Sequence, residues 1–207
     1  SADFQKGLTA YKSGDYATAL REFKPLANNG DAASQHKLSL MYFNGFGVSQ
    51  DYKTAHKWLK LSVEQDYAAA HNSLGYVYFN GTGVSKDLKN AIKWWRLSAK
   101  QGYSKAQFYL GLMYRFGSGV PQNFQTSIKW FRLAADQGDS DAQFYLGLAY
   151  YYGERGVPQN YMTAVKWYKL AAATKDKIAS AAQSNLGEMY YNGYDGVPQN
   201  YKTAVKW

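Results

Sequence analysis

Apolar side chains recur every third or fourth residue along most of the chain. In the segment 104–116, Ala106, Leu110 and Tyr114 are each four residues apart. Side chains with this spacing lie on one face of a helix, so the pattern predicts an amphipathic helix of about three turns. We call this predicted helix, and its counterparts elsewhere in the chain, helix A.

A second helix is predicted directly after a break in the pattern. The segment 117–122 contains two glycines and a proline, which favour a turn. Asn123 follows as the predicted N-cap, because its side-chain oxygen can accept a hydrogen bond from a free N–H of the first turn. This helix B has Trp130 or Phe131 on its inner face and ends near Gly138. Helices A and B together predict a helical hairpin.

This sequence of helix A, glycine-containing turn and helix B occurs five times in the chain. Its tryptophans, Trp58, Trp94, Trp130, Trp167 and Trp207, are separated by 36, 36, 37 and 40 residues. The other repeated positions are a leucine (Leu38, Leu74, Leu110, Leu146, Leu186), a tyrosine (Tyr42, Tyr78, Tyr114, Tyr150, Tyr190), a loop valine (Val48, Val84, Val120, Val157, Val197) and a capping residue (Asp51, Asp87, Asn123, Asn160, Asn200). A glycine inside helix A (Gly75, Gly111, Gly147, Gly187, with Ser39 in the first copy) predicts a close helix crossing.

A regular period of this length indicates stacked copies of one unit. We therefore predict an all-α fold, a right-handed α/α superhelical solenoid of stacked antiparallel helical hairpins. Residues 1–30 form a tetratricopeptide-like hairpin that turns at Ser13-Gly14-Asp15. Five repeats follow in one continuous domain, at about 31–66, 67–102, 103–138, 139–177 and 178–207, and the last is incomplete.

The repeated positions resemble a known family. Ala-x-x-x-Leu-Gly-x-x-Tyr, Gly-x-Gly-Val-x-x-Asp/Asn, Ala-x-x-Trp and the small residues of 133–135 are similar to the Sel-one-like repeat, a relative of the tetratricopeptide repeat. The resemblance covers about residues 31–207. It implies a non-enzymatic adaptor that scaffolds membrane-associated complexes, signalling assemblies, or contacts with envelope or host components. It implies no particular partner.

Composition and motifs argue against catalysis and bound cofactors. The chain has no cysteine, and no apolar run reaches the ~18 residues that a transmembrane helix needs. His36, His56 and His71 lack a matching set of metal ligands. Each Gly-x-Gly-Val follows a helix, whereas a dinucleotide-binding loop follows a strand. No nucleophile is paired with a base. We expect no enzyme activity, cofactor, metal or small-molecule substrate.

The chain is basic, with a net charge of +9 and a pI near 9.4. Much of the excess comes from the lysine before each repeated tryptophan, on the predicted outer face of helix B (Lys57, Lys93, Lys129, Lys166 and Lys206). A solvated face is the simpler interpretation, and binding of an anionic surface, a glycan or nucleic acid is the alternative. Nucleic acid is disfavoured because the tryptophans occupy predicted core positions.

Helices A are the predicted binding surface. In tetratricopeptide-like solenoids they line the concave side, where aromatic rings and asparagines suit an extended peptide and arginine suits a carboxylate. The candidate residues are His36, Phe43, Asn44, Asn72, Tyr76, Phe79, Asn80, Phe108, Arg115, Phe116, Phe144, Tyr151 and Tyr152. The corresponding positions of the fifth copy are Ser184, Glu188, Tyr191 and Asn192. For each ring, packing between helices remains an equal alternative.

The two ends of the chain leave several alternatives open. Ser1 and Ala2 are small residues of the kind left by signal-peptide cleavage, or they mark an artificial boundary. A periplasmic or secreted location is slightly favoured over the cytoplasm. Trp207 lies inside a predicted helix B, so we expect a truncated chain, an unstructured tail, or end-to-end self-association through the exposed apolar face.

Overall fold

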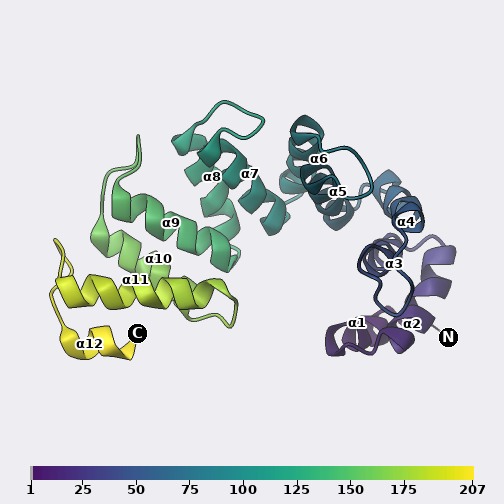
Figure 1. Ribbon diagram of the computed structural model, residues 1–207, viewed down its shortest axis with the longest axis horizontal. Coiled ribbons are helices and arrows are strands. Elements are labelled where there is room, and N and C mark those ends of the chain that lie inside the picture. The colour runs from purple at the N-terminus through teal and green to yellow at the C-terminus, as the bar shows by residue number, and fades with distance from the viewer. Residues whose placement is uncertain (1) are drawn as a thin grey trace. The chain divides into compact units, whose positions relative to one another are not determined.

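The structure is a computed structural model that describes residues 2–207, so Ser1, part of the predicted processed terminus, lies outside the described residues. Within residues 2–207 there are twelve α-helices and no β-strand (Figure 1). In chain order the hairpins are α1 (Phe4–Ser13) with α2 (Tyr16–Asn28), α3 (Ala32–Asn44) with α4 (Tyr52–Glu64), α5 (Ala68–Asn80) with α6 (Leu88–Lys100), α7 (Ser104–Phe116) with α8 (Phe124–Ala135), α9 (Ser140–Tyr152) with α10 (Tyr161–Ala172), and α11 (Ile178–Asn192) with α12 (Tyr201–Lys206). The predicted all-α fold is confirmed.

The helices form two compact units. The first contains α1 to α6 and the second, Gly102–Trp207, contains α7 to α12. In both units each odd-numbered helix packs against the even-numbered helix after it, and that helix packs against the next hairpin of its unit. In the second unit α9 also contacts α11 directly. Each unit is therefore a stack of helical hairpins, as expected for a solenoid.

The predicted ends of the helices are largely correct. Helix α7 spans the predicted 104–116, and each predicted capping residue accepts a hydrogen bond from the N–H three residues later (Asp51, Asp87, Asn123, Asn160 and Asn200). Helix α8 ends at Ala135, three residues before the predicted Gly138, which adopts a positive φ of 88° in the turn. Among the loop valines only Val157 and Val197 are buried.

The tryptophans are less buried than the pattern predicts. Trp58, Trp94, Trp130 and Trp167 are all half-buried, whereas the side chain after each of them (Leu59, Trp95, Phe131 and Tyr168) is at most 1% exposed. The apolar stripe of helix B is wide enough to contain both neighbours. The hydrophobic pattern alone cannot decide which of them points toward helix A, and the structure selects the second.

The glycine inside helix A explains this choice. A Cβ atom at Gly75, Gly111 or Gly147 would lie 2.4–2.5 Å from a ring carbon of Trp95, Phe131 or Tyr168, respectively. Real side chains do not approach so closely, so the glycine makes room for the ring. The predicted close crossing is confirmed, and its partner is the residue after the tryptophan.

Candidate functional site

Three of the predicted surface residues belong to the core. His36, Phe43 and Phe108 are 5%, 9% and 7% exposed. Phe43 packs against His56 with ring centroids 5.1 Å apart, and Phe108 lies 5.9 Å from Phe131. These three side chains therefore pack in the core and do not form part of a binding surface, because neighbouring helices cover them.

His36 is buried and in contact with two polar side chains. Its Nε2 lies 2.8 Å from Ser73 Oγ, and its ring meets Tyr67 edge-on. Burial, assisted by the nearby charge of Lys37, lowers the pKa of His36 from 6.5 to about 3. The imidazole is therefore neutral in the folded protein at neutral pH.

We expect acid to destabilise the protein through His36. Below pH 6.5 the unfolded chain binds a proton at this imidazole, whereas the folded chain does not. The contribution of neutral His36 to the free energy of unfolding is therefore fully present above pH 6.5 and decreases as the pH falls toward 3. Between pH 7 and 5.5 this group alone should reduce the free energy of unfolding by about 1 kcal/mol. Urea denaturation at both pH values should show this loss in the native chain and a smaller one in His36→Gln. Equal losses in both proteins would contradict the assignment.

The other candidates of the first unit are mostly engaged in local contacts. Asn44 donates to the carbonyl of Leu40, and the backbone carbonyl of Asn72 accepts from Trp95 Nε1 at 3.2 Å. Phe79 packs on Trp95 with ring centroids 5.5 Å apart. Asn80 and Tyr76 are exposed. The first unit thus presents polar groups and one large exposed ring on its helices A.

The second unit brings the candidate residues into closer association. Arg115 at the end of α7 forms an ion pair with Glu154, which follows α9. The side chains are only 14% and 9% exposed. Burial raises the pKa of Glu154, and Arg115 opposes this effect. The guanidinium also lies over the rings of Phe116 and Tyr145, at 5.8 and 5.5 Å from their centroids.

Three large aromatic rings are exposed on the helices A of this unit, and the third is Tyr191 of α11. Phe116 ends α7 and Tyr152 ends α9, and they are 60% and 65% exposed. They occupy equivalent positions of successive repeats. Phe144 and Tyr151 are half-buried: Phe144 packs on Tyr168, and the Tyr151 hydroxyl is hydrogen-bonded to that of Tyr194 at 2.8 Å. This hydrogen bond, with burial, raises the pKa of Tyr151.

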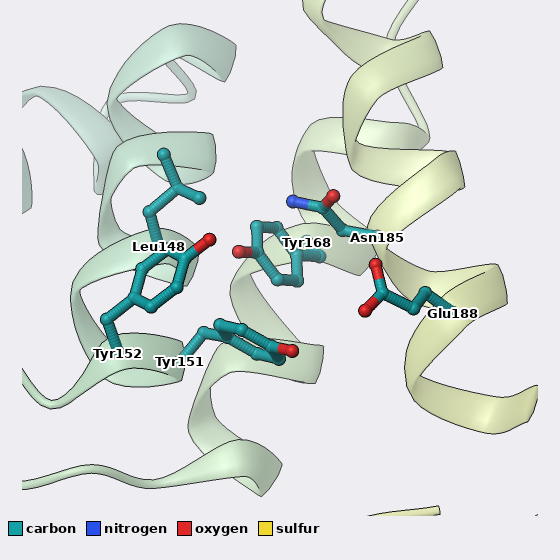
Figure 2. Close-up of a pocket in the computed structure, with 6 residues that line it drawn as sticks. All are labelled: Leu148, Tyr151, Tyr152, Tyr168, Asn185 and Glu188. Carbon is teal, nitrogen blue, oxygen red and sulfur yellow. The ribbon is translucent and has the colours of Figure 1, made fainter. Parts of the chain in front are cut away.

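A small pocket lies between α9, α10 and α11 (Figure 2). Its volume is about 60 Å³. The lining residues are Leu148, Tyr151 and Tyr152 from α9, Tyr168 from α10, and Asn185 and Glu188 from α11. Figure 2 shows the three tyrosines and Glu188 arranged around the same space, with the hydroxyl ends of Tyr152 and Tyr168 directed toward each other.

The Tyr168 hydroxyl is the unusual group in this pocket. The residue is 1% exposed, and within residues 2–207 its hydroxyl oxygen has no hydrogen-bond partner. Asn185 approaches it without reaching hydrogen-bond geometry. Burial is the main cause that raises the pKa of Tyr168. An unpaired buried hydroxyl costs about 1–3 kcal/mol, so this group calls for an explanation beyond packing.

Sequence reasoning predicted only part of this site. It selected Tyr151 and Tyr152 as candidates and placed Glu188 at a surface position of helix A. It missed Tyr168, because the pattern left open whether the tryptophan or the residue after it lies on the inner face of helix B, and it gave no role to Asn185. The available signal was the hydroxyl itself, since the equivalent residues Leu59, Trp95 and Phe131 have none.

The site contains no arrangement typical of metal binding. In the part of the chain that the structure describes, no three His, Asp or Glu side chains gather in a way that could hold a metal ion. Nor does any helix of residues 2–207 have the length and apolar character required to cross a membrane. What the site presents is exposed aromatic surface beside a compact polar pocket.

Comparison with known proteins accounts for the repeated hairpin. A family model described as Sel1 repeat matches residues 32–67, 68–103, 104–139, 140–173 and 180–207. The chain belongs to the Sel1 repeat family. Sel1 repeat proteins are generally non-catalytic scaffolds that mediate protein interactions. No curated protein matches the chain.

Solved Sel1 repeat structures are similar over nearly the whole chain. A Sel1 repeat protein from Oxalobacter formigenes is 34% identical with a TM-score of 0.87, over 99% of this chain and 82% of that one. The protective antigen c5321 of uropathogenic Escherichia coli is 33% identical with a TM-score of 0.78, and the match covers 99% of this chain but 44% of the antigen. Immunity protein Pa5087 from Pseudomonas aeruginosa shares the fold, with a TM-score of 0.64 and 18% sequence identity. This match covers 100% of this chain and 76% of that one.

Proposed function

We propose that the chain is a protein-interaction scaffold that binds a peptide or protein segment along helices α7, α9 and α11 of its second unit. The observation that carries the proposal is the exposure of Phe116 and Tyr152 at equivalent positions of two successive repeats. Soluble domains rarely expose large rings in a repeated series without a use for them. Aromatic rings of this kind supply most of the binding energy in many interfaces.

The surroundings of these rings support recognition of a segment rather than nonspecific adhesion. The charge of Arg115 is already matched by Glu154, and this pair links the ends of α7 and α9 that carry the two rings. Polar groups at the rim can hydrogen-bond an extended backbone: Asn185, Glu188 and the hydroxyl of Tyr152 all line the neighbouring pocket. A rigid aromatic surface with a polar rim suits peptide binding.

The proposal is tested with peptides selected against the intact chain from a random display library. We expect Tyr152→Ala to weaken binding of a selected peptide at least tenfold, because truncation of a central ring typically removes ~2 kcal/mol or more. Leu133→Ala is the matched control, since Leu133 is 50% exposed but belongs to α8. Titration calorimetry measures both affinities. Peptides that bind both variants equally well, or lose affinity equally, would contradict this surface.

The lysine face of helices B is the alternative. Lys57, Lys93, Lys129 and Lys166 are all exposed, so the basic residues are accessible to an anionic surface or glycan. Heparin binding by the native chain that is lost on Lys129→Glu and Lys166→Glu, and that weakens with salt, would support this function. In the absence of such binding, the aromatic surface of the second unit remains the favoured one.

A further inference from the structure

The pocket between α9, α10 and α11 contains three departures from the repeat. Tyr168 occupies the position that holds Leu59, Trp95 and Phe131 in other copies, and it alone adds a hydroxyl. Glu188 is the one acidic residue at its repeat position, which otherwise holds leucine or tyrosine (Leu40, Tyr76, Leu112 and Leu148). Tyr152 replaces the asparagine of three other copies (Asn44, Asn80 and Asn192). Packing of the hairpin requires none of these changes.

The three departures meet at the same place. Tyr152, Tyr168 and Glu188 come from three different helices, and all line the pocket of about 60 Å³ (Figure 2). The Tyr168 hydroxyl is directed toward Tyr152 (Figure 2) and has no hydrogen-bond partner in the described chain. Phenylalanine in the same position of the third copy fills the same kind of slot. The hydroxyl is therefore not needed to fill the slot beside the helix A glycine.

The charge around the pocket favours a cationic ligand. No basic side chain of residues 2–207 forms an ion pair with Glu188, although the whole chain is strongly basic. The nearby cation Arg115 is already paired with Glu154. Tyrosine rings attract cations through their negative faces, and a carboxylate beside them adds to that attraction. An anion would instead be repelled by Glu188.

The size and polar groups of the pocket restrict the cation further. A cavity that holds one water needs ~10–15 Å³ on this scale, so about 60 Å³ accepts an ammonium with one or two methylenes. The Tyr168 hydroxyl and the oxygens of Glu188 and Asn185 can accept hydrogen bonds, which a primary ammonium donates and a quaternary one does not.

We propose that this pocket binds the ammonium group of a lysine side chain on the partner segment. The inference rests on the proposed function, since the lysine belongs to the segment that lies across α9 and α11. Tyr151, Tyr152 and Tyr168 surround the ammonium, Glu188 neutralises its charge, and the Tyr168 hydroxyl accepts one of its N–H groups. The pocket thus selects a lysine at one position of the bound segment.

The test uses the capped tripeptide Ac-Ala-Lys-Ala-NH₂ and the intact chain. Amide NMR shifts should saturate at residues of α9 and α11 around the pocket, and the norleucine tripeptide, which lacks the amine, should cause no saturable shift. Glu188→Gln should weaken binding of the lysine probe at least tenfold, because it removes the negative charge that attracts the ammonium. The fold should be unaffected, since Glu188 is exposed and glutamine has nearly the same shape. Asp136→Asn, an exposed acid outside the pocket, should leave the affinity unchanged.

Tyr168→Phe separates binding from folding. It should weaken the lysine probe at least tenfold and leave the melting temperature equal or higher, because it removes an unpaired buried hydroxyl. Equal binding of the lysine and norleucine probes, or tighter binding of tetramethylammonium than of the lysine probe, would overturn the inference. So would tight binding of triglycine through its free N-terminus without binding of the capped lysine probe. A selected peptide that loses affinity on Tyr152→Ala but contains no required lysine would retain the proposed function and refute the lysine pocket.

Discussion

Replacing Glu154 by glutamine is expected to lower the free energy of unfolding by about 3–5 kcal/mol. The change leaves Arg115, whose side chain is 14% exposed, without its negative partner. A buried charge that loses its partner keeps its desolvation cost and loses the attraction that compensated for it. Urea denaturation followed by circular dichroism measures the difference.

Two further variants test whether the loss comes from the unpaired buried charge of Arg115. Glu64→Gln removes an acid from the exposed Lys60–Glu64 pair, where both side chains are more than half exposed, and should cost ~0–1 kcal/mol. The double variant Arg115→Met with Glu154→Leu removes both charges and should recover most of the loss, since apolar replacements of a buried pair are often neutral or stabilising. If Glu154→Gln cost no more than Glu64→Gln, the buried pair would not stabilise the second unit.

Replacing Gly111 by alanine is expected to destabilise the protein by about 2 kcal/mol. The new Cβ would lie 2.4 Å from two ring carbons of Phe131, whose side chain is fully buried. Overpacking of this kind costs ~1–3 kcal/mol, and the better helix propensity of alanine returns at most ~1 kcal/mol. The melting temperature and the urea midpoint should both decrease.

The repeat itself supplies the controls for this substitution. A Cβ at Gly187, in the same position of α11, would meet one backbone oxygen at 3.4 Å, so Gly187→Ala should be neutral or stabilising. In the first copy a larger residue, Ser39, accompanies the smaller Leu59. Gly111→Ala combined with Phe131→Leu should therefore cost less than the sum of the two single changes. Additive losses would show that glycine and ring do not contact each other as described.

Much of the fold was predictable because its causes are local or periodic. The bounds of α7, the capping residues Asp51 and Asn123, and the turn at Gly14 follow from spacing and backbone preferences that each short segment expresses by itself. The Sel1 repeat family could be inferred for the same reason, since five copies repeat the same local requirements.

The candidate site was only partly predictable. Helical spacing placed Phe116 and Tyr152 on the surface of helices A, and both are exposed. The same spacing placed Phe43 and Phe108 there, yet neighbouring helices cover them. The helical period shows on which face of its helix a side chain lies. It does not show whether the neighbouring hairpin covers that face.

The sequence by itself determined the repeat, its helices and caps, and the glycine that permits close packing, because these depend on residues within one hairpin. Only the tertiary structure decided that Tyr168, rather than Trp167, fills the space beside Gly147, and that Tyr168 lines one pocket together with Tyr152 and Glu188. These side chains come from three helices, and their meeting depends on the angles and distances between hairpins. Such distances are set by packing over many residues at once, which no short pattern encodes.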